Sequence, residues 1–137
     1  MTTQAAESAY SVPWEASSLV SILVIDDDEE FRDLAAGLLT SAGFHVSTVA
    51  GAAEGLKYMR SHPVELVILD MIMPDRDGID ALSEIKIYFP GVHVVTVSGA
   101  ADSDLYLTVS SYLGADASLH KSRIASLCAL LNVILDK

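Results

Sequence analysis

The sequence predicts an α/β fold in which five parallel strands form a sheet covered by helices on both faces. Short continuous runs of Val, Ile and Leu alternate with segments whose apolar residues recur every three or four positions, and the alternation repeats five times. Strands that are apolar throughout need cover on both faces, and consecutive parallel strands are joined by right-handed helical crossovers. The predicted architecture is therefore a three-layer α/β sandwich. These patterns alone leave the strand order open.

The first half of the chain contains two strand–helix pairs. The apolar run over 19–25 predicts the first strand, and apolar residues beginning at Phe31 form one face of a helix over 29–42. Gly43 follows where a helix end favours a left-handed residue. The run over 44–50 predicts the second strand, and 52–61 predicts a helix that Pro63 ends.

The second half contains three more pairs. The third strand is predicted at 65–69, before a helix over 79–89 that Pro90 and Gly91 end. The fourth strand, 92–97, precedes a helix over 102–113. A weaker fifth strand, 116–120, precedes a last helix over 124–134, which is apolar nearly all round. We expect one domain over 19–137, after a flexible N-terminal arm over 1–18 that is rich in Ser, Ala and Thr.

Composition excludes several classes of protein. With 51% hydrophobic residues among 137, the chain is not disordered, and its net charge of −11 makes direct nucleic-acid binding by this domain unfavourable. The N-terminus has neither the basic residues nor the apolar segment of a signal peptide, and no apolar run approaches the ~20 residues that span a bilayer. The single cysteine, Cys128, is expected to be a reduced core residue, so we expect a cytoplasmic protein with no membrane contact.

Polar side chains follow four of the predicted strands. Asp26 and Asp27 follow the first strand, Asp70 the third, Ser98 the fourth and Lys121 the fifth. In an open parallel sheet, the carboxyl ends of the strands lie at one edge, and ligands bind there. We therefore expect these side chains to converge on one site.

The charges of these side chains indicate what the site would bind. Three carboxylates and one ammonium leave an excess of two negative charges, which matches a divalent cation, and oxygen ligands favour Mg²⁺. A carboxylate beside a metal ion and an ammonium suits phosphoryl transfer, because both cations neutralise phosphoryl oxygens. Asp70 would be the nucleophile, Lys121 its cationic partner and Ser98 a hydrogen-bond donor.

Each feature also has a structural explanation. An acidic run at a helix start is typical of helix capping, which suits Asp28 and the two glutamates after it. Asp70 alone could be a turn residue and Lys121 alone a solvated charge, while Asp75 and Asp77 are expected to shape a loop and cap the next helix. The common position of these polar residues at the same end of different strands favours a shared site.

Four motifs now identify a family. The segments ILVIDDDEEFR, ILDMIMPDRDG, VVTVSGAAD and GADASLHK resemble the acidic turn, phosphoacceptor loop, hydroxyl switch and lysine strand of the receiver domains of bacterial two-component response regulators. The resemblance covers residues 19 to about 136 and is closest to single-receiver, chemotaxis-regulator-like proteins. It implies a flavodoxin-like sheet of order 2-1-3-4-5 and a phosphorylation-activated signalling switch rather than an enzyme, apart from its own Mg²⁺-dependent phosphorylation and dephosphorylation.

The resemblance also implies roles for individual residues. Asp70 would accept a phosphoryl group from a phosphohistidine of a sensor histidine kinase or phosphotransfer protein. Asp27, Asp70 and the backbone carbonyl of Ile72 would hold Mg²⁺, and Asp26 would help through water. Lys121 would pair with the phosphoryl group and Ser98 would donate a hydrogen bond to it.

Three positions depart from the family pattern. Ser122 replaces the usual proline after the lysine, and Ser118 replaces an aromatic residue that the family couples to the switch hydroxyl. Any output must then travel by another route. Ile72 has no hydrogen bond to offer an attacking water, so we expect slow loss of the phosphoryl group.

A partner or a second copy of the chain is expected to bind the face formed by 102–113, 116–120 and 124–134.

Other functions remain as alternatives. A degenerate receiver, which binds partners without phosphorylation, is the main alternative. A haloacid-dehalogenase-type phosphatase would need an acid where Ile72 stands, and a flavin- or nucleotide-binding module would need a phosphate cradle in place of the three aspartates after the first strand.

Overall fold

The computed structural model describes residues 19–74, 78–100 and 103–136. The described strands are β1 (Ser21–Ile25), β2 (His45–Val49), β3 (Leu66–Asp70), β4 (His93–Ser98) and β5 (Ala117–His120). The described helices are α2 (Glu29–Ser41), α3 (Ala52–Ser61), α4 (Gly78–Tyr88), α5 (Ser103–Tyr112) and α6 (Leu127–Leu135), with the 3₁₀ helix η1 (Lys121–Ser126) before α6. The predicted arm over 1–18 lies outside the described residues.

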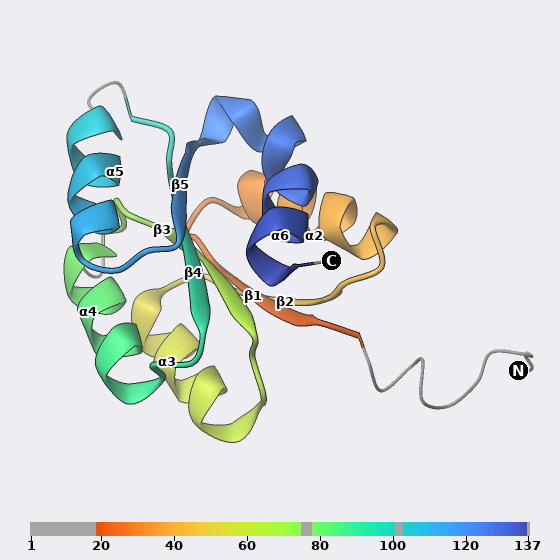
Figure 1. Ribbon diagram of the computed structural model, residues 1–137, viewed down its shortest axis with the longest axis horizontal. Coiled ribbons are helices and arrows are strands. Elements are labelled where there is room, and N and C mark those ends of the chain that lie inside the picture. The colour runs from red at the N-terminus through yellow and green to blue at the C-terminus, as the bar shows by residue number, and fades with distance from the viewer. Residues whose placement is uncertain (1–18, 75–77, 101–102, 137) are drawn as a thin grey trace, which may run out of the picture.

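The strands form one parallel sheet in the order β2-β1-β3-β4-β5 (Figure 1). Helices α2 and α6 cover one face, and α3, α4 and α5 cover the other. Alternate side chains of β1 divide between two apolar clusters: Ile22 and Val24 pack with α2 and α6, whereas Leu23 and Ile25 pack with α3 and α4. The predicted α/β sandwich is confirmed, as is the strand order that the resemblance implied.

Local contacts define the ends of several helices. Asp28 caps α2, because its Oδ1 accepts a hydrogen bond from the N–H of Glu30 at 3.0 Å. Gly43 has the predicted left-handed backbone, with a φ of 98°. At the start of α4, a Cβ on Gly78 would collide with the backbone of Met71, so the absence of a side chain lets the helix approach the loop after β3.

The last predicted helix differs in its first turn. Residues 124–126 belong to the 3₁₀ helix η1, where the N–H of Ser122 donates to Nδ1 of His120 at 3.1 Å, a local bond that offers an alternative to a regular α-helical turn. Beyond it, Leu127 and Leu131 are fully buried, as their spacing predicts. Cys128 packs against the same cluster but is only half-buried. Within the described residues, no helix combines the length and apolar character needed to cross a membrane.

Candidate functional site

The register of the sheet places two aspartates next to each other. Ile25 and Leu69 form the last pair between β1 and β3, so Asp26 follows β1 beside Asp70, the last residue of β3. Both therefore lie at the carboxyl edge of the sheet. Lys121 follows directly after β5 and reaches the same edge from the far side of β4.

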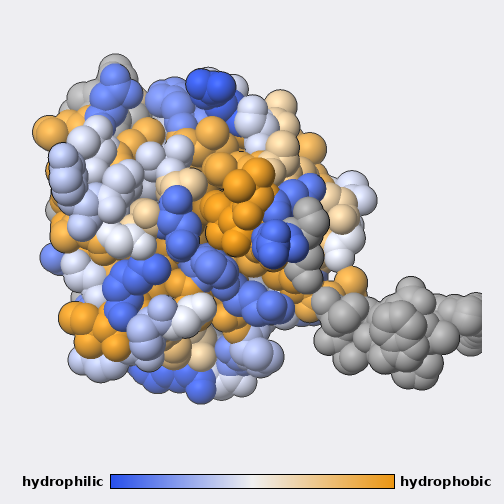
Figure 2. Space-filling view, viewed as in Figure 1, coloured by the Kyte–Doolittle hydropathy of each residue, from blue (hydrophilic) through white to orange (hydrophobic). Residues whose placement is uncertain are grey.

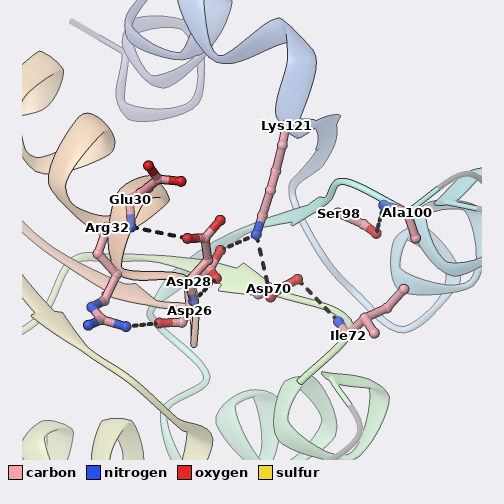
Figure 3. A network of polar contacts seen from close by, with 9 residues as sticks. All are labelled: Asp26, Asp28, Glu30, Arg32, Asp70, Ile72, Ser98, Ala100 and Lys121. Atoms are coloured by element: carbon pink, nitrogen blue, oxygen red, sulfur yellow. Dashed lines mark hydrogen bonds and ion pairs between the residues drawn. The ribbon is translucent and has the colours of Figure 1, made fainter. Parts of the chain in front are cut away.

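Ion pairs connect these side chains (Figure 3). Nζ of Lys121 lies 2.7 Å from Oδ2 of Asp26 and 3.6 Å from Oδ2 of Asp70. Asp26 is fully buried and Asp70 is only 3% exposed, whereas the side chain of Lys121 is 19% exposed. Asp27 is exposed, but one of its carboxylate oxygens lies within 4.8 Å of oxygens of the other two aspartates. The predicted convergence of three acids and one lysine is confirmed.

Backbone and side-chain donors hold the turns that carry the two buried carboxylates. The N–H of Asp28 donates to Oδ1 of Asp26 at 2.9 Å, and the N–H of Ile72 donates to Oδ1 of Asp70 at 3.2 Å. Nη1 of Arg32 donates to the backbone carbonyl of Asp26 at 2.8 Å. Each carboxylate is therefore oriented by the turn that follows its own strand, and the first of these turns is also tied to α2.

Two residues of this site were not predicted in their structural roles. Arg32 binds the turn after β1, and Phe31, expected only as an apolar helix residue, places its ring under the ammonium of Lys121. Both belong to the first turn of α2, next to the acidic run. Their proximity to that run is the signal that could have drawn attention to them.

The site raises the pKa values of both Asp70 and Lys121, for different reasons. Burial raises the pKa of Asp70 to about 7, and the negative charge of Asp26 adds to the effect, while the N–H of Ile72 and the ammonium of Lys121 oppose it. Burial lowers the pKa of Lys121, but the hydrogen bond to Asp26 and the charges of both buried aspartates outweigh it and raise that pKa. The ammonium is thus held charged, whereas Asp70 titrates close to neutral pH.

The other predicted site residues lie at the same edge of the sheet. Ser98 is fully buried at the end of β4, and its Oγ accepts a hydrogen bond from the N–H of Ala100 at 3.4 Å. Ile72 is 40% exposed beside Asp70, so its side chain does not shield the carboxylate completely. The predicted loop residues Asp75 and Asp77 lie outside the described residues.

The donor set fits a hard divalent cation. Asp26, Asp27 and Asp70 offer only oxygen ligands, at spacings that one ion can bridge. With Lys121 counted, the cluster has an excess of two negative charges when all three acids are ionised. An acidic cluster of this kind could hold a metal ion and, with the lysine, a phosphoryl group.

The family is shown by a match to the model of the response regulator receiver domain, which covers residues 22–132. The chain belongs to this family. Receiver domains are the phosphorylation-activated switches of two-component signalling systems, and they work with histidine kinases in general. A phosphorylation-activated switch is therefore the general function of the chain.

Two curated proteins illustrate the relation. The receiver domain is 33% identical to the regulatory protein VanRc of Enterococcus gallinarum over 96 residues, which cover 69% of this chain and 40% of that protein. It is 34% identical to a putative NtrX-like response regulator of Rickettsia bellii over 84 residues, which cover 60% of this chain and 18% of that protein. The chain thus spans less than half the length of these relatives.

Solved structures agree with the fold. A CheY-like receiver domain protein from Methanospirillum hungatei superposes with a TM-score of 0.80 at 30% identity, covering 87% of this chain and 95% of that one. The response regulator TrrA from Thermotoga maritima, solved in complex with Mg²⁺-BeF, has a TM-score of 0.67 at 28% identity and covers 74% of this chain and 86% of that one.

Proposed function

We propose that Asp70 is the phosphoacceptor of this receiver domain. The observation that carries the proposal is its position, buried at the end of β3 with the ammonium of Lys121 3.6 Å from Oδ2. A carboxylate oxygen of Asp70 attacks phosphorus, the bond from phosphorus to the leaving nitrogen of a phosphohistidine breaks, and that nitrogen takes up a proton. Lys121 stabilises the negative charge on the transferred phosphoryl oxygens.

We also propose that the site holds Mg²⁺. Asp27 and Asp70 would supply carboxylate oxygens, Asp26 would assist through water, and the backbone carbonyl of Ile72 would be a further ligand. When bound, the ion neutralises phosphoryl oxygens and favours the ionised form of Asp70. The donor spacing and the Mg²⁺-BeF complex of the Thermotoga relative support this assignment.

Two neighbouring residues adjust the life of the phosphorylated state. Ser98 is assigned to donate a hydrogen bond from its hydroxyl to a phosphoryl oxygen, because it ends β4 at the edge where Lys121 also lies. Ile72 offers an apolar side chain, partly exposed next to Asp70, and gives no hydrogen bond to an attacking water. Slow hydrolysis of the aspartyl phosphate is therefore expected.

The proposed phosphodonor is a sensor histidine kinase or a phosphotransfer protein in the cytoplasm.

Phosphorylation would shift the receiver between two conformations, and a partner or a second copy would bind the face formed by α5, β5 and α6 in one of them. Leu105 and Tyr112 of α5 and Val133 of α6 are strongly exposed there, and Figure 2 shows apolar surface over α6. Ser118 of β5 and residues of α5 line an open groove of about 710 Å³.

Intact mass tests the central proposal. After incubation with acetyl phosphate and Mg²⁺, the full chain should gain one phosphate, and Asp70→Asn should gain none. Asp33→Asn is the matched control, because it removes an equal charge at an exposed position of α2 and should still be phosphorylated. Absence of the gain in the wild type, or its persistence in Asp70→Asn, would show that the phosphoacceptor assignment is wrong.

A further inference from the structure

Lys121 is confined by more than its two carboxylate partners. Its Nζ lies 4.6 Å from the centroid of the Phe31 ring, and Phe31 is only 6% exposed. On another side, a Cβ on Gly99 would come within 3.3 Å of Cδ of Lys121, so a larger residue there would crowd the stem. The long, flexible lysine therefore runs through a narrow passage between α2 and the end of β4.

We propose that Phe31 is a positioning residue that holds the ammonium of Lys121 beside the phosphoacceptor through a cation–π contact. The inference rests on the proposed function of Asp70 and adds to it a residue that acts through Lys121. The face of an aromatic ring attracts an ammonium, so the ring of Phe31 restricts the side-chain rotamers of Lys121 before phosphoryl transfer. Because the lysine side chain is only 19% exposed, water competes weakly for it.

A ring has an advantage over a third carboxylate at this position. Asp26 and Asp70 already contact Lys121, and a further negative charge would repel an incoming phosphoryl group. The quadrupole of Phe31 attracts the ammonium but adds no net charge to the site.

The placement of Phe31 follows from the turn after β1. Asp28 caps α2 and donates its N–H to Asp26, and Arg32 donates to the carbonyl of Asp26. Phe31 precedes Arg32 in the same helical turn. The chain segment that orients a metal-binding carboxylate thus also orients the ring.

Fluorinated phenylalanines at position 31 provide the test, because added fluorine weakens the cation–π contact with little change in shape. In the full chain with Mg²⁺ and acetyl phosphate, the initial rate of phosphate gain should fall stepwise from phenylalanine to the monofluoro, difluoro and trifluoro forms. A contact of this class corresponds to roughly 2-fold to 30-fold, and we expect about fivefold across the series. The same series at Phe44 is the control, since Phe44 packs against the same apolar cluster and the described structure shows no ammonium over its ring.

A spectroscopic measurement tests the contact without phosphorylation. In the metal-free protein, the Hε resonances of Lys121 should be shifted upfield by the ring current of Phe31, and Phe31→Leu should remove the shift. Equal rates along the Phe31 series would overturn the proposal, as would an equal decline along the Phe44 series or a Lys121 shift that Phe31→Leu leaves unchanged. If the wild type takes up no phosphate, the proposed function fails, while the resonance shift still decides whether the ring holds the lysine.

Discussion

Replacing Asp70 by Asn should stabilise the metal-free protein even though it removes the proposed phosphoacceptor. Asp70 is almost fully buried and lies beside Asp26, so its ionisation on folding is opposed by desolvation and by repulsion. An amide of nearly the same shape carries no charge to desolvate. The substitution therefore separates the stability of the site from its chemistry.

The sign of the pH dependence follows from proton linkage. The pKa of Asp70 is raised from 3.8 to about 7, so between these values the folded state binds more protons than the unfolded state. The free energy of unfolding therefore falls as the pH rises from about 4 to about 7 and then levels off. Below pH 4 the group is protonated in both states and has no such effect.

The magnitude comes from the same displacement of the pKa. A change from 3.8 to about 7 corresponds to at most about 4 kcal/mol of lost stability above pH 7. Water reaches the edge of the site through the exposed Asp27 and the partly exposed Ile72, so we discount this to about 1–3 kcal/mol. Mg²⁺ should reverse the difference, because its binding favours the ionised carboxylate of the wild type and gains less from an amide.

Urea unfolding at pH 4, 6 and 8, with EDTA or with Mg²⁺, measures these differences. In EDTA, the advantage of Asp70→Asn over the wild type should grow with pH, and in Mg²⁺ it should shrink or change sign. Asp33→Asn controls for the general benefit of removing one negative charge from a chain of net charge −11. An Asp70→Asn protein that is no more stable than Asp33→Asn at pH 8 in EDTA would refute the argument.

Three further predictions concern packing and the life of the phosphoryl group. Thr96→Val and Ser110→Ala each break the buried hydrogen bond of 2.7 Å between the two hydroxyl groups, and each should lower the free energy of unfolding by about 1–2 kcal/mol. Urea titration should show that the double variant loses less than the sum of the two single variants. Ile72→Asn should speed loss of the phosphoryl group by roughly fivefold through a new hydrogen bond to water, followed by intact mass over time; an unchanged half-life would contradict this. Gly78→Ala should destabilise the protein by about 2 kcal/mol or more, because the new methyl group would collide with the backbone of Met71. Gly37→Ala, where nothing lies near the new methyl group, should stabilise the protein by about 0.5–1 kcal/mol. Thermal melts measure both variants, and equal effects would show that crowding is not the cause.

Much of the fold was predictable because its signals are local. Apolar runs and three-to-four spacing locate all five described strands and their helices to within a few residues, and Gly43 ends its helix as expected. The strand order was not contained in those patterns and came from the resemblance of four motifs to a family. The first turn of the last helix was missed, because apolar spacing does not distinguish a 3₁₀ turn held by His120 from an α-helical one.

The candidate site was predictable as a set of residues but not as an arrangement. Asp26 and Asp27 are neighbours with the same side chain, yet one is fully buried against Lys121 and the other is exposed. That difference depends on how the turn after β1 packs, which involves Arg32 of α2 and the carbonyl of Val49 at the end of β2.

The sequence by itself determined the type of each element, the apolar faces and the polar residues at the strand ends, because these depend on spacing over a few positions. Only the tertiary structure decided which carboxylate pairs with the lysine, how strongly burial shifts the pKa of Asp70, and that the ring of Phe31 lies under Lys121. Those properties depend on distance and desolvation, which arise only when segments far apart in the chain pack together.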